Sequence, residues 1–139
     1  MELQECINFL LSTSQNKVFK HFSKLLEAYE VTPAQYGVLN CLWHEGQLLP
    51  KQIGEMLYLE APTVSGILDK MQKAGFIERS VDPENRRTVL VVATPKANEL
   101  KEKIDKATEA LNATAFQHLS SHEQEVLKKA LVTMINTEF

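Results

Sequence analysis

The sequence predicts a mainly α-helical fold that carries one small β-hairpin. Apolar residues recur at the spacing of an amphipathic helix through most of the 139 residues. One β-branched run of strand length, Thr88–Thr94, follows a turn rich in charged residues. The segment before this hairpin, Ala61–Gly75, has one narrow apolar stripe made of Val64, Ile67, Leu68 and Met71. A helix that runs into a hairpin in this order indicates a winged helix-turn-helix.

Three helices are expected before the segment Ala61–Gly75. The first spans about Leu3–Tyr29, with its apolar residues on a shared face. Thr32 is the N-cap and Pro33 the first residue of the second helix, which ends near Gly46. A short third helix covers about Pro50–Leu57.

The hairpin has its own start and turn signals. Gly75 supplies the left-handed residue that ends the preceding helix. Phe76–Arg79 is the first strand, and Asp82–Asn85 is a type I turn because Asp is its first residue and Pro its second. The β-branched run Thr88–Thr94 is the second strand.

Two further helices follow the hairpin. Pro95 opens a long helix that ends near Leu119. Ser120 and Glu123 form a capping box for a final helix. Its apolar stripe consists of Val126, Leu127, Ala130, Leu131, Met134 and Ile135.

The face of Ala61–Gly75 opposite the apolar stripe is small and polar. It carries Pro62, Thr63, Ser65, Gly66 and Lys70. Short hydroxyl side chains near a helix N-terminus let the backbone approach phosphates and base edges in the major groove. Taken alone, this segment is equally compatible with an ordinary amphipathic helix. The hairpin that follows it favours a DNA recognition helix.

The arginines favour DNA. All three, Arg79, Arg86 and Arg87, lie within nine residues of the hairpin, whereas lysines are spread along the chain. Such clustering points to phosphate or minor-groove contact. The net charge of −3 argues mildly against a nucleic-acid partner, but a basic tip on an acidic body remains compatible with one. We therefore expect DNA contacts from Pro62, Thr63, Ser65, Gly66, Lys70, Arg86 and Arg87.

The first helix and the last two carry more apolar surface than one winged motif can cover. Their natural partner is a second copy of the chain. A twofold dimer places two recognition helices about 34 Å apart and selects a pseudo-palindromic operator in double-stranded DNA. The chain is predicted to be one domain, residues 1–139, with the winged helix-turn-helix at about 32–95 and dimerisation helices at about 1–30 and 95–139.

Several motifs together resemble the MarR family of winged helix-turn-helix regulators. They are Val31–Leu39, Pro62–Ser65, Leu68–Lys70, Asp82–Arg87 and Ala93–Thr94. The chain departs from the family pattern at Asn85, where an aspartate is usual, at Ala97, where a glycine is common, and at Tyr58, where a glycine is frequent in the turn. The resemblance implies a homodimeric transcriptional regulator, most often a repressor that a small ligand releases from DNA.

The resemblance also implies a site for small aromatic, often phenolic, effectors between the dimerisation helices and the winged motif. Five aromatic residues are candidates for it: Phe9, Phe19, Phe22, Tyr36 and Trp43. Core packing explains each of them equally well, so the ligand-binding residues stay unknown.

One branch of the family senses organic peroxides through a cysteine in the first helix, supported by two tyrosines. Aligned on Leu25–Leu26 and Gln35–Tyr36, that cysteine falls on Asn8, two residues from Cys6, and the tyrosines fall on Ser12 and Phe22. The match to this branch thus fails by half a helical turn, and the neighbours Glu2, Glu5 and Asn8 offer no cation that would stabilise a thiolate at Cys6. A thiol-based redox regulator is kept as an alternative. A winged-helix module that binds protein rather than DNA is another.

Other classes lack support in the sequence. His118 and His122 have the spacing of a metal pair, but the residues between them read as a helix end and a new N-cap. No phosphate loop or nucleophile elbow is present, so we expect neither an enzyme nor a cofactor or metal site. No apolar run approaches a membrane span and the first residues lack a signal-peptide pattern, which predicts a cytoplasmic protein.

Overall fold

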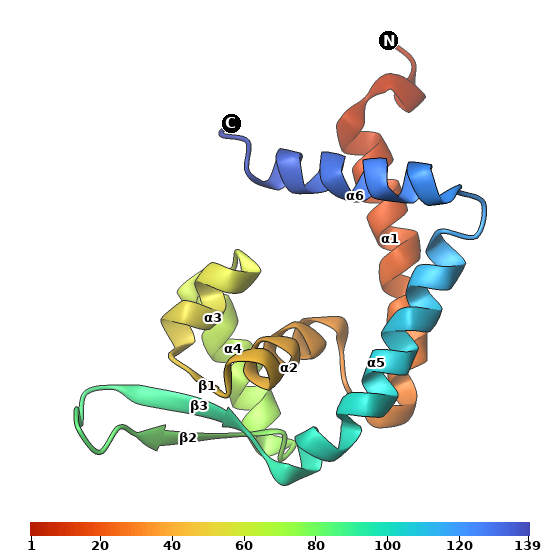
Figure 1. Ribbon diagram of the computed structural model, residues 1–139. Helices are drawn as coiled ribbons and strands as arrows, with labels where there is room; N and C mark the ends of the chain where they lie inside the picture. The colour runs from red at the N-terminus through yellow and green to blue at the C-terminus, as the bar shows by residue number, and fades with distance from the viewer.

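The computed structural model describes all residues, 1–139, and contains six α-helices and three β-strands (Figure 1). The elements follow one another as α1 (Ile7–Leu26), α2 (Pro33–Glu45), β1 (Gln47–Leu48), α3 (Pro50–Leu57), α4 (Ala61–Lys73), β2 (Ile77–Val81), β3 (Val89–Ala93), α5 (Pro95–Ala115) and α6 (Ser121–Ile135). The predicted class, mainly α-helical with a small hairpin, is confirmed.

The first predicted helix is divided rather than continuous. Short 3-10 turns at Leu3–Glu5 and Glu27–Tyr29 flank α1. The carboxylate of Glu5 accepts a hydrogen bond from the backbone N–H of Glu2 at 2.8 Å, which stabilises the first of these turns. The second ends at Glu30, whose φ of 57° is left-handed and stops the chain from continuing as a helix.

The predicted start and stop residues of α2 and α3 hold. The Thr32 hydroxyl accepts a hydrogen bond from the backbone N–H of Gln35, and the side-chain oxygen of Gln35 accepts one from the backbone N–H of Thr32. This capping box at the start of α2 was not predicted. Helix α3 ends at Tyr58, which adopts the left-handed conformation at φ 56°. Tyr58 thus takes the backbone shape that glycine more readily supplies there.

The hairpin is part of a three-stranded antiparallel sheet with the order β1-β3-β2. Strand β1 pairs through Gln47 with Val92 and through Leu48 with Val91. Strand β1 was not predicted, because its two residues are too few to show an alternating pattern. Beyond this short strand, β2 and β3 pair only with each other and project from the body as the wing.

One hydrophobic core joins the C-terminal half of α1 to the winged motif and to α5. Its largest fully buried side chains come from almost every element: Leu26, Leu39, Leu42, Ile53, Leu68, Met71, Phe76, Ile77 and Ile104. Burying such a side chain stabilises a fold by roughly 1.5–3 kcal/mol. Because α4 and β2 both contribute, the same core fixes the recognition helix and the base of the wing.

The helices at the other end of the molecule are poorly covered. Helix α5 ends at Ala115, four residues before the predicted end, and α6 buries none of its residues. Figure 1 shows α6 at the end of the molecule that holds the N-terminal half of α1, away from the winged motif. The apolar side chains exposed there are Leu3, Ile7, Leu10, Leu11, Val126, Leu127, Val132 and Ile135. None of the helices combines the length and the apolar character needed to cross a bilayer.

Candidate nucleic-acid interface

Helix α4 presents the two faces that its sequence predicts. Val64, Leu68 and Met71 are buried in the core, each at most 2% exposed. The five residues of α4 that are predicted to contact DNA lie on the exposed side of the helix: Pro62, Thr63, Ser65, Gly66 and Lys70. The structure therefore brings these five residues together on one surface of one helix.

The N-terminus of α4 lacks a side-chain cap. Its N-cap residue, Glu60, makes no capping hydrogen bond, whereas Thr32 caps α2 and Ser120 caps α6. Pro62 has no N–H, but the N–H groups of Ala61 and Thr63 in the first turn keep their donor capacity, and the positive end of the helix dipole lies beside them. An anion such as a DNA phosphate suits this arrangement.

Gly66 leaves the exposed face of α4 open. A β-carbon built at Gly66 has no neighbouring atom within 4 Å. Gly54 in α3 is the opposite case, because a β-carbon there lies 2.9 Å from the carbonyl oxygen of Leu59. Packing thus explains Gly54 but gives no reason for Gly66, where only an outside partner would meet a side chain.

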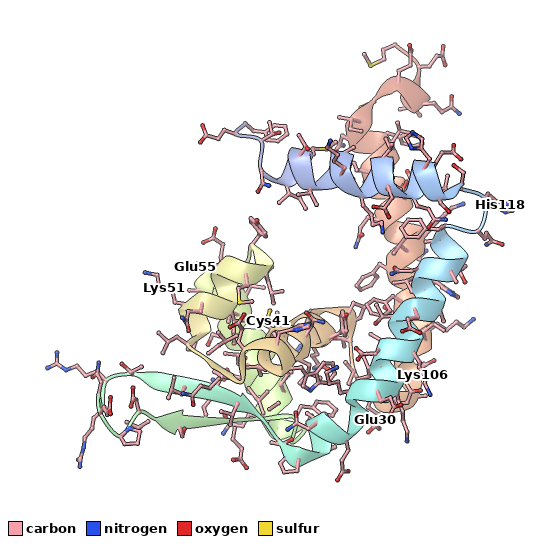
Figure 2. The ribbon with its side chains drawn as sticks, viewed as in Figure 1. Glu30, Cys41, Lys51, Glu55, Lys106 and His118 are labelled. Atoms are coloured by element: carbon pink, nitrogen blue, oxygen red, sulfur yellow. The ribbon has the colours of Figure 1, made fainter.

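The wing ends in the predicted turn. The N–H of Asn85 donates to the carbonyl of Asp82 at 3.2 Å, a bond that closes a β-turn over Asp82–Asn85, and the N–H of Glu84 donates to the Asp82 carboxylate at 2.9 Å. Arg86 and Arg87 follow this turn and are exposed. Figure 2 shows long nitrogen-tipped side chains pointing outward from this loop, away from the body.

Asn85 acts on the backbone of the wing rather than on a guanidinium. Its side-chain oxygen accepts from the backbone N–H of Arg87 at 3.2 Å. The chain's three ion pairs include neither Arg86 nor Arg87. Both charges therefore remain available to an external anion.

Arg79 is placed differently from the other two arginines. Its Nη2 lies 2.7 Å from Oδ1 of Asp69, and its Nε donates to Oε1 of Gln72 at 2.6 Å. The clustering of the three arginines in sequence pointed to phosphate or minor-groove contact, and DNA contacts were expected from Arg86 and Arg87 but not from Arg79. In the structure, the Arg79 guanidinium is engaged within the chain, and only Arg86 and Arg87 are free.

A hollow of about 820 Å³ lies between α3 and α4, with Arg79 at its edge. Val64 and Leu68 contribute apolar surface, and Ser65 lines it as well. Lys51, at the start of α3, also lines it and points toward the side on which the wing projects (Figure 2). Sequence reasoning missed Lys51, which as one of many scattered lysines gave no signal.

The C-terminal end of α4 is joined to α5. The Thr94 hydroxyl donates to the carbonyl of Gly75 at 2.6 Å, and Nζ of Lys96 donates to the carbonyl of Ala74 at 2.7 Å. The same ammonium lies 4.8 Å from the centre of the Phe76 ring. The recognition helix is therefore attached directly to the helix that leads into the predicted dimerisation region.

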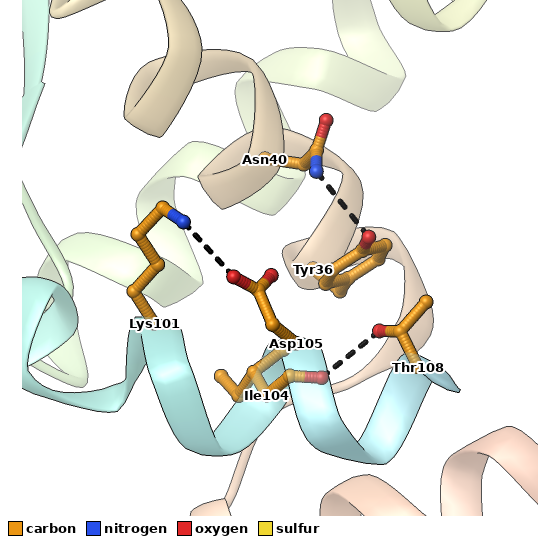
Figure 3. A network of polar contacts seen from close by, with 6 residues as sticks. All are labelled: Tyr36, Asn40, Lys101, Ile104, Asp105 and Thr108. Carbon is orange, nitrogen blue, oxygen red and sulfur yellow. Dashed lines mark hydrogen bonds and ion pairs between the residues drawn. The ribbon is translucent and has the colours of Figure 1, made fainter. Parts of the chain in front are cut away.

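Polar side chains also gather where α2 faces α5 (Figure 3). Asn40 donates to the Tyr36 hydroxyl at 3.3 Å, and on α5 Lys101 pairs with Asp105 at 2.9 Å. Among the aromatic candidates for an effector site, Phe22 packs edge-on against Tyr36, with 5.2 Å between ring centres. The indole N–H of Trp43 is buried without a hydrogen-bond partner.

The two cysteines and the paired histidines lie apart from these surfaces. Cys6 is half-buried at the start of α1, and Cys41 is buried in α2. Burial raises the pKa of the Cys41 thiol, with a smaller contribution from the nearby Glu45 carboxylate. His118 lies in the connection after α5, whereas His122 lies in α6. The structure brings together no group of three His, Cys, Asp or Glu side chains that suits a metal ion.

Comparison with known proteins points to the part of the chain that contains α4 and the wing. The model of the MarR family matches residues 31–89. The organic hydroperoxide resistance transcriptional regulator of Bacillus subtilis strain 168 is 33% identical over 137 residues, which cover 99% of this chain and 92% of that protein. Its name describes a regulator rather than an enzyme, in agreement with the prediction that this chain has no enzymatic activity.

Two solved structures share the fold. Bordetella bronchiseptica BpsR, described for the regulation of its DNA binding by 6-hydroxynicotinic acid, has a TM-score of 0.92 at 23% identity and covers 99% of each chain. A mutant of E. coli MarR complexed with operator DNA has a TM-score of 0.86 at 21% identity and covers 92% of each chain. These likenesses confirm the predicted winged helix-turn-helix architecture with flanking helices.

Proposed function

Since the chain belongs to the MarR family, we propose that it acts as a homodimeric, sequence-specific repressor that a small aromatic ligand releases from DNA. Its class is that of a DNA-binding transcriptional regulator. The observation that carries the proposal is the pairing of an exposed, small polar face on α4 with two unpaired arginines on the wing. We place its action in the cytoplasm.

In this proposal the two parts of the surface have different tasks. Thr63 and Ser65 contact base edges or nearby phosphates from the start of α4, with Pro62, Gly66 and Lys70 along the same groove. Arg86 and Arg87 reach phosphates and the adjacent minor groove, where the pattern distinguishes little more than A·T from G·C. The helix therefore supplies sequence choice and the wing supplies affinity.

The uncovered apolar surface supports a homodimer. Helix α6 begins with a capping box at Ser120 and Glu123 and has apolar residues at helical spacing along its 15 residues. It nevertheless buries no residue in a single chain. Exposed apolar side chains of α1 lie at the same end of the molecule. A second copy placed against them would remove this area from water and fix the spacing of two half-sites at about 34 Å.

Selection from a random DNA library tests the DNA-binding part. The wild-type protein should enrich a pseudo-palindromic duplex, and the logarithm of its affinity should fall linearly with the logarithm of salt concentration, by about 0.9 for each phosphate contact. No enrichment would refute sequence-specific binding. Binding to another protein through the same surface, without salt-dependent DNA affinity, would favour the interaction-module alternative.

Sedimentation of the full chain tests the dimer. At micromolar concentration we expect a dimer with or without DNA, because the exposed apolar area belongs to the free protein. Replacing Leu127 with Glu, at an exposed apolar position of α6, should shift the chain toward monomer and weaken binding to the selected duplex. A wild-type chain that sediments as a monomer while binding the palindrome contradicts the proposal.

For the ligand, the polar groups between α2 and α5 support a site for a small aromatic acid or phenol. Asn40 donates to the Tyr36 hydroxyl there, and the Phe22 ring packs against Tyr36. On α5, the ion pair of Lys101 with Asp105 would have to open for Lys101 to bind an acid. BpsR gives a precedent for the ligand class, since 6-hydroxynicotinic acid regulates its DNA binding. Such a ligand releases DNA only to the extent that it prefers a spacing of the two recognition helices that does not match the operator.

One observation favours a second candidate function, thiol-based sensing of peroxide. The Bacillus subtilis relative is named for organic hydroperoxide resistance. Cys6 is the less buried of the two thiols and lies at the N-terminal end of α1. Peroxide should then dissociate the wild-type complex but not the Cys6→Ser complex; equal responses of the two proteins exclude this route through Cys6.

A further inference from the structure

We propose that Arg79 is a positioning residue that fixes the wing relative to the recognition helix, rather than a DNA ligand like Arg86 and Arg87. This inference rests on the proposed DNA binding and deepens it. It concerns three side chains: Arg79 on β2, and Asp69 and Gln72 on α4. We refer to this group as the wing clasp.

The geometry of the wing clasp is that of a two-point contact. The guanidinium uses Nη2 for the Asp69 carboxylate at 2.7 Å and Nε for the Gln72 amide oxygen at 2.6 Å. Asp69 and Gln72 are three residues apart and hence neighbours on the surface of α4. Two hydrogen bonds from one planar group fix orientation as well as distance, which a single point charge would not do.

The clasp lies where the wing loses its other supports. Strand β1 pairs with β3 only at Val91 and Val92, and Val91 is also the partner of Arg79 across the β2-β3 ladder. Beyond this point Ser80 and Val81 are exposed, and β2 and β3 pair only with each other. Arg79 is thus the last residue of β2 that is partly buried, at the base of the projecting segment.

The clasp also changes the charge of the recognition helix. Asp69 is on the exposed side of α4, with 56% of its side chain accessible, and a free carboxylate there would repel DNA phosphates. Pairing with Arg79 neutralises it. The same ion pair therefore removes an unfavourable charge from the interface and orients the wing that carries Arg86 and Arg87.

Simultaneous contact by helix and wing depends on this orientation. Arg86 and Arg87 reach the DNA without an added ordering cost only if the wing already has the correct angle when the recognition helix enters the groove. Losing the clasp leaves all direct contacts chemically intact but makes the projecting hairpin more mobile. Affinity for the selected duplex should then fall about three- to tenfold.

Asp69→Asn gives the sharpest test, because two explanations predict opposite signs. If charge alone matters, removing a carboxylate from the DNA-facing surface strengthens binding. If the clasp matters, Asp69→Asn and Arg79→Gln both weaken binding to the selected duplex, and the double variant is no weaker than Arg79→Gln alone. Arg79→Lys keeps the charge but loses the two-point geometry, so it should restore only part of the affinity.

The salt slope separates positioning from direct contact. Arg79→Gln should leave the slope unchanged, whereas the matched variant Arg86→Gln, which removes an arginine of the wing that has no ion pair, should reduce it by about one. A reduction of about one for Arg79→Gln, or tighter specific binding by Asp69→Asn, would overturn the proposal. Melting curves of the variants show whether any loss reflects unfolding.

Nuclear magnetic resonance of the free protein tests the clasp without DNA. Backbone order parameters of Ser80, Val81, Val89 and Leu90 should drop from values near the ~0.85 of rigid backbone toward ~0.6 in Arg79→Gln and in Asp69→Asn, but not in Arg86→Gln. Unchanged order parameters in the first two variants refute the clasp. If the wild type enriches no DNA, the proposed function fails, and these order parameters still decide whether Arg79 fixes the wing.

Discussion

Replacing Gly66 with Ala should stabilise the protein and at the same time weaken its binding to DNA. Gly66 lies in the interior of α4, has no strained backbone, and leaves its surroundings open to 4 Å around an added β-carbon. Glycine within a helix is about 0.8–1.0 kcal/mol less favourable than alanine. The variant should therefore gain close to 1 kcal/mol per chain, because nothing in the protein opposes the added methyl group.

For a chain of 139 residues, this gain should raise the melting temperature by about 3 °C. The shift is about the same for a dimer, since both the added free energy and the entropy of unfolding double. Gly54→Ala is the matched control in the adjacent helix. Its β-carbon would lie 2.9 Å from the carbonyl oxygen of Leu59, so the same substitution should lower the melting temperature there.

The effect on DNA has the opposite sign if the exposed face of α4 enters the major groove. An added methyl group in a close-packed contact costs typically ~1–3 kcal/mol. Two half-sites double this cost, so affinity for the selected duplex should fall by at least about 30-fold, with a smaller loss on random DNA. Titration of both duplexes at fixed salt measures the difference. A more stable variant with unchanged affinity would show that Gly66 does not face the DNA.

Three further predictions concern the wing, the ligand and the thiols. Arg87→Ala should weaken binding to the selected duplex and to random DNA nearly equally. It should also reduce the slope of log affinity against log salt concentration by about one, as titrations at several salt concentrations will show. Salicylate should raise the melting temperature of the free protein and lower its affinity for the selected duplex by about 5- to 150-fold, and calorimetry should find that DNA weakens salicylate binding by the same factor. Because burial raises the pKa of the Cys41 thiol, iodoacetamide at neutral pH should alkylate Cys6 first, as mass spectrometry of the modified peptides will show. The stability gained by keeping Cys41 neutral is complete below the ordinary thiol pKa and is lost as pH rises through the raised one.

Signals within a few residues of each other made much of the fold predictable. Proline at the first helical position fixed the starts of α2, α3 and α5, and the Ser120–Glu123 capping box fixed that of α6. The β-turn at Asp82–Asn85 follows from Asp82 and Pro83 in the same way. Each of these features depends on local backbone conformation, which adjacent residues determine.

Features that join distant segments were not predictable. The Lys96 contact with Ala74 spans 22 residues, and the Arg79 contact with Asp69 spans ten. Neither pair has a spacing that distinguishes it from unpaired lysines, arginines and aspartates elsewhere in the chain. The clustering of arginines predicted a basic wing, and the sequence analysis named Arg86 and Arg87 as its DNA contacts, but only the tertiary structure shows that Arg79 pairs with α4.

An acidic chain can still bind DNA if its charges are arranged as they are here. The net charge of −3 gives little long-range attraction to a polyanion, so the local field at the wing and at the start of α4 must dominate. The chain separates its charges accordingly, with Arg86 and Arg87 unpaired at the tip and Asp69 neutralised by Arg79 at the base. Because the attraction is concentrated at these few points, the binding depends on holding the wing at the correct angle. If the wing clasp acts as proposed, an arginine that contacts no DNA therefore still controls the affinity.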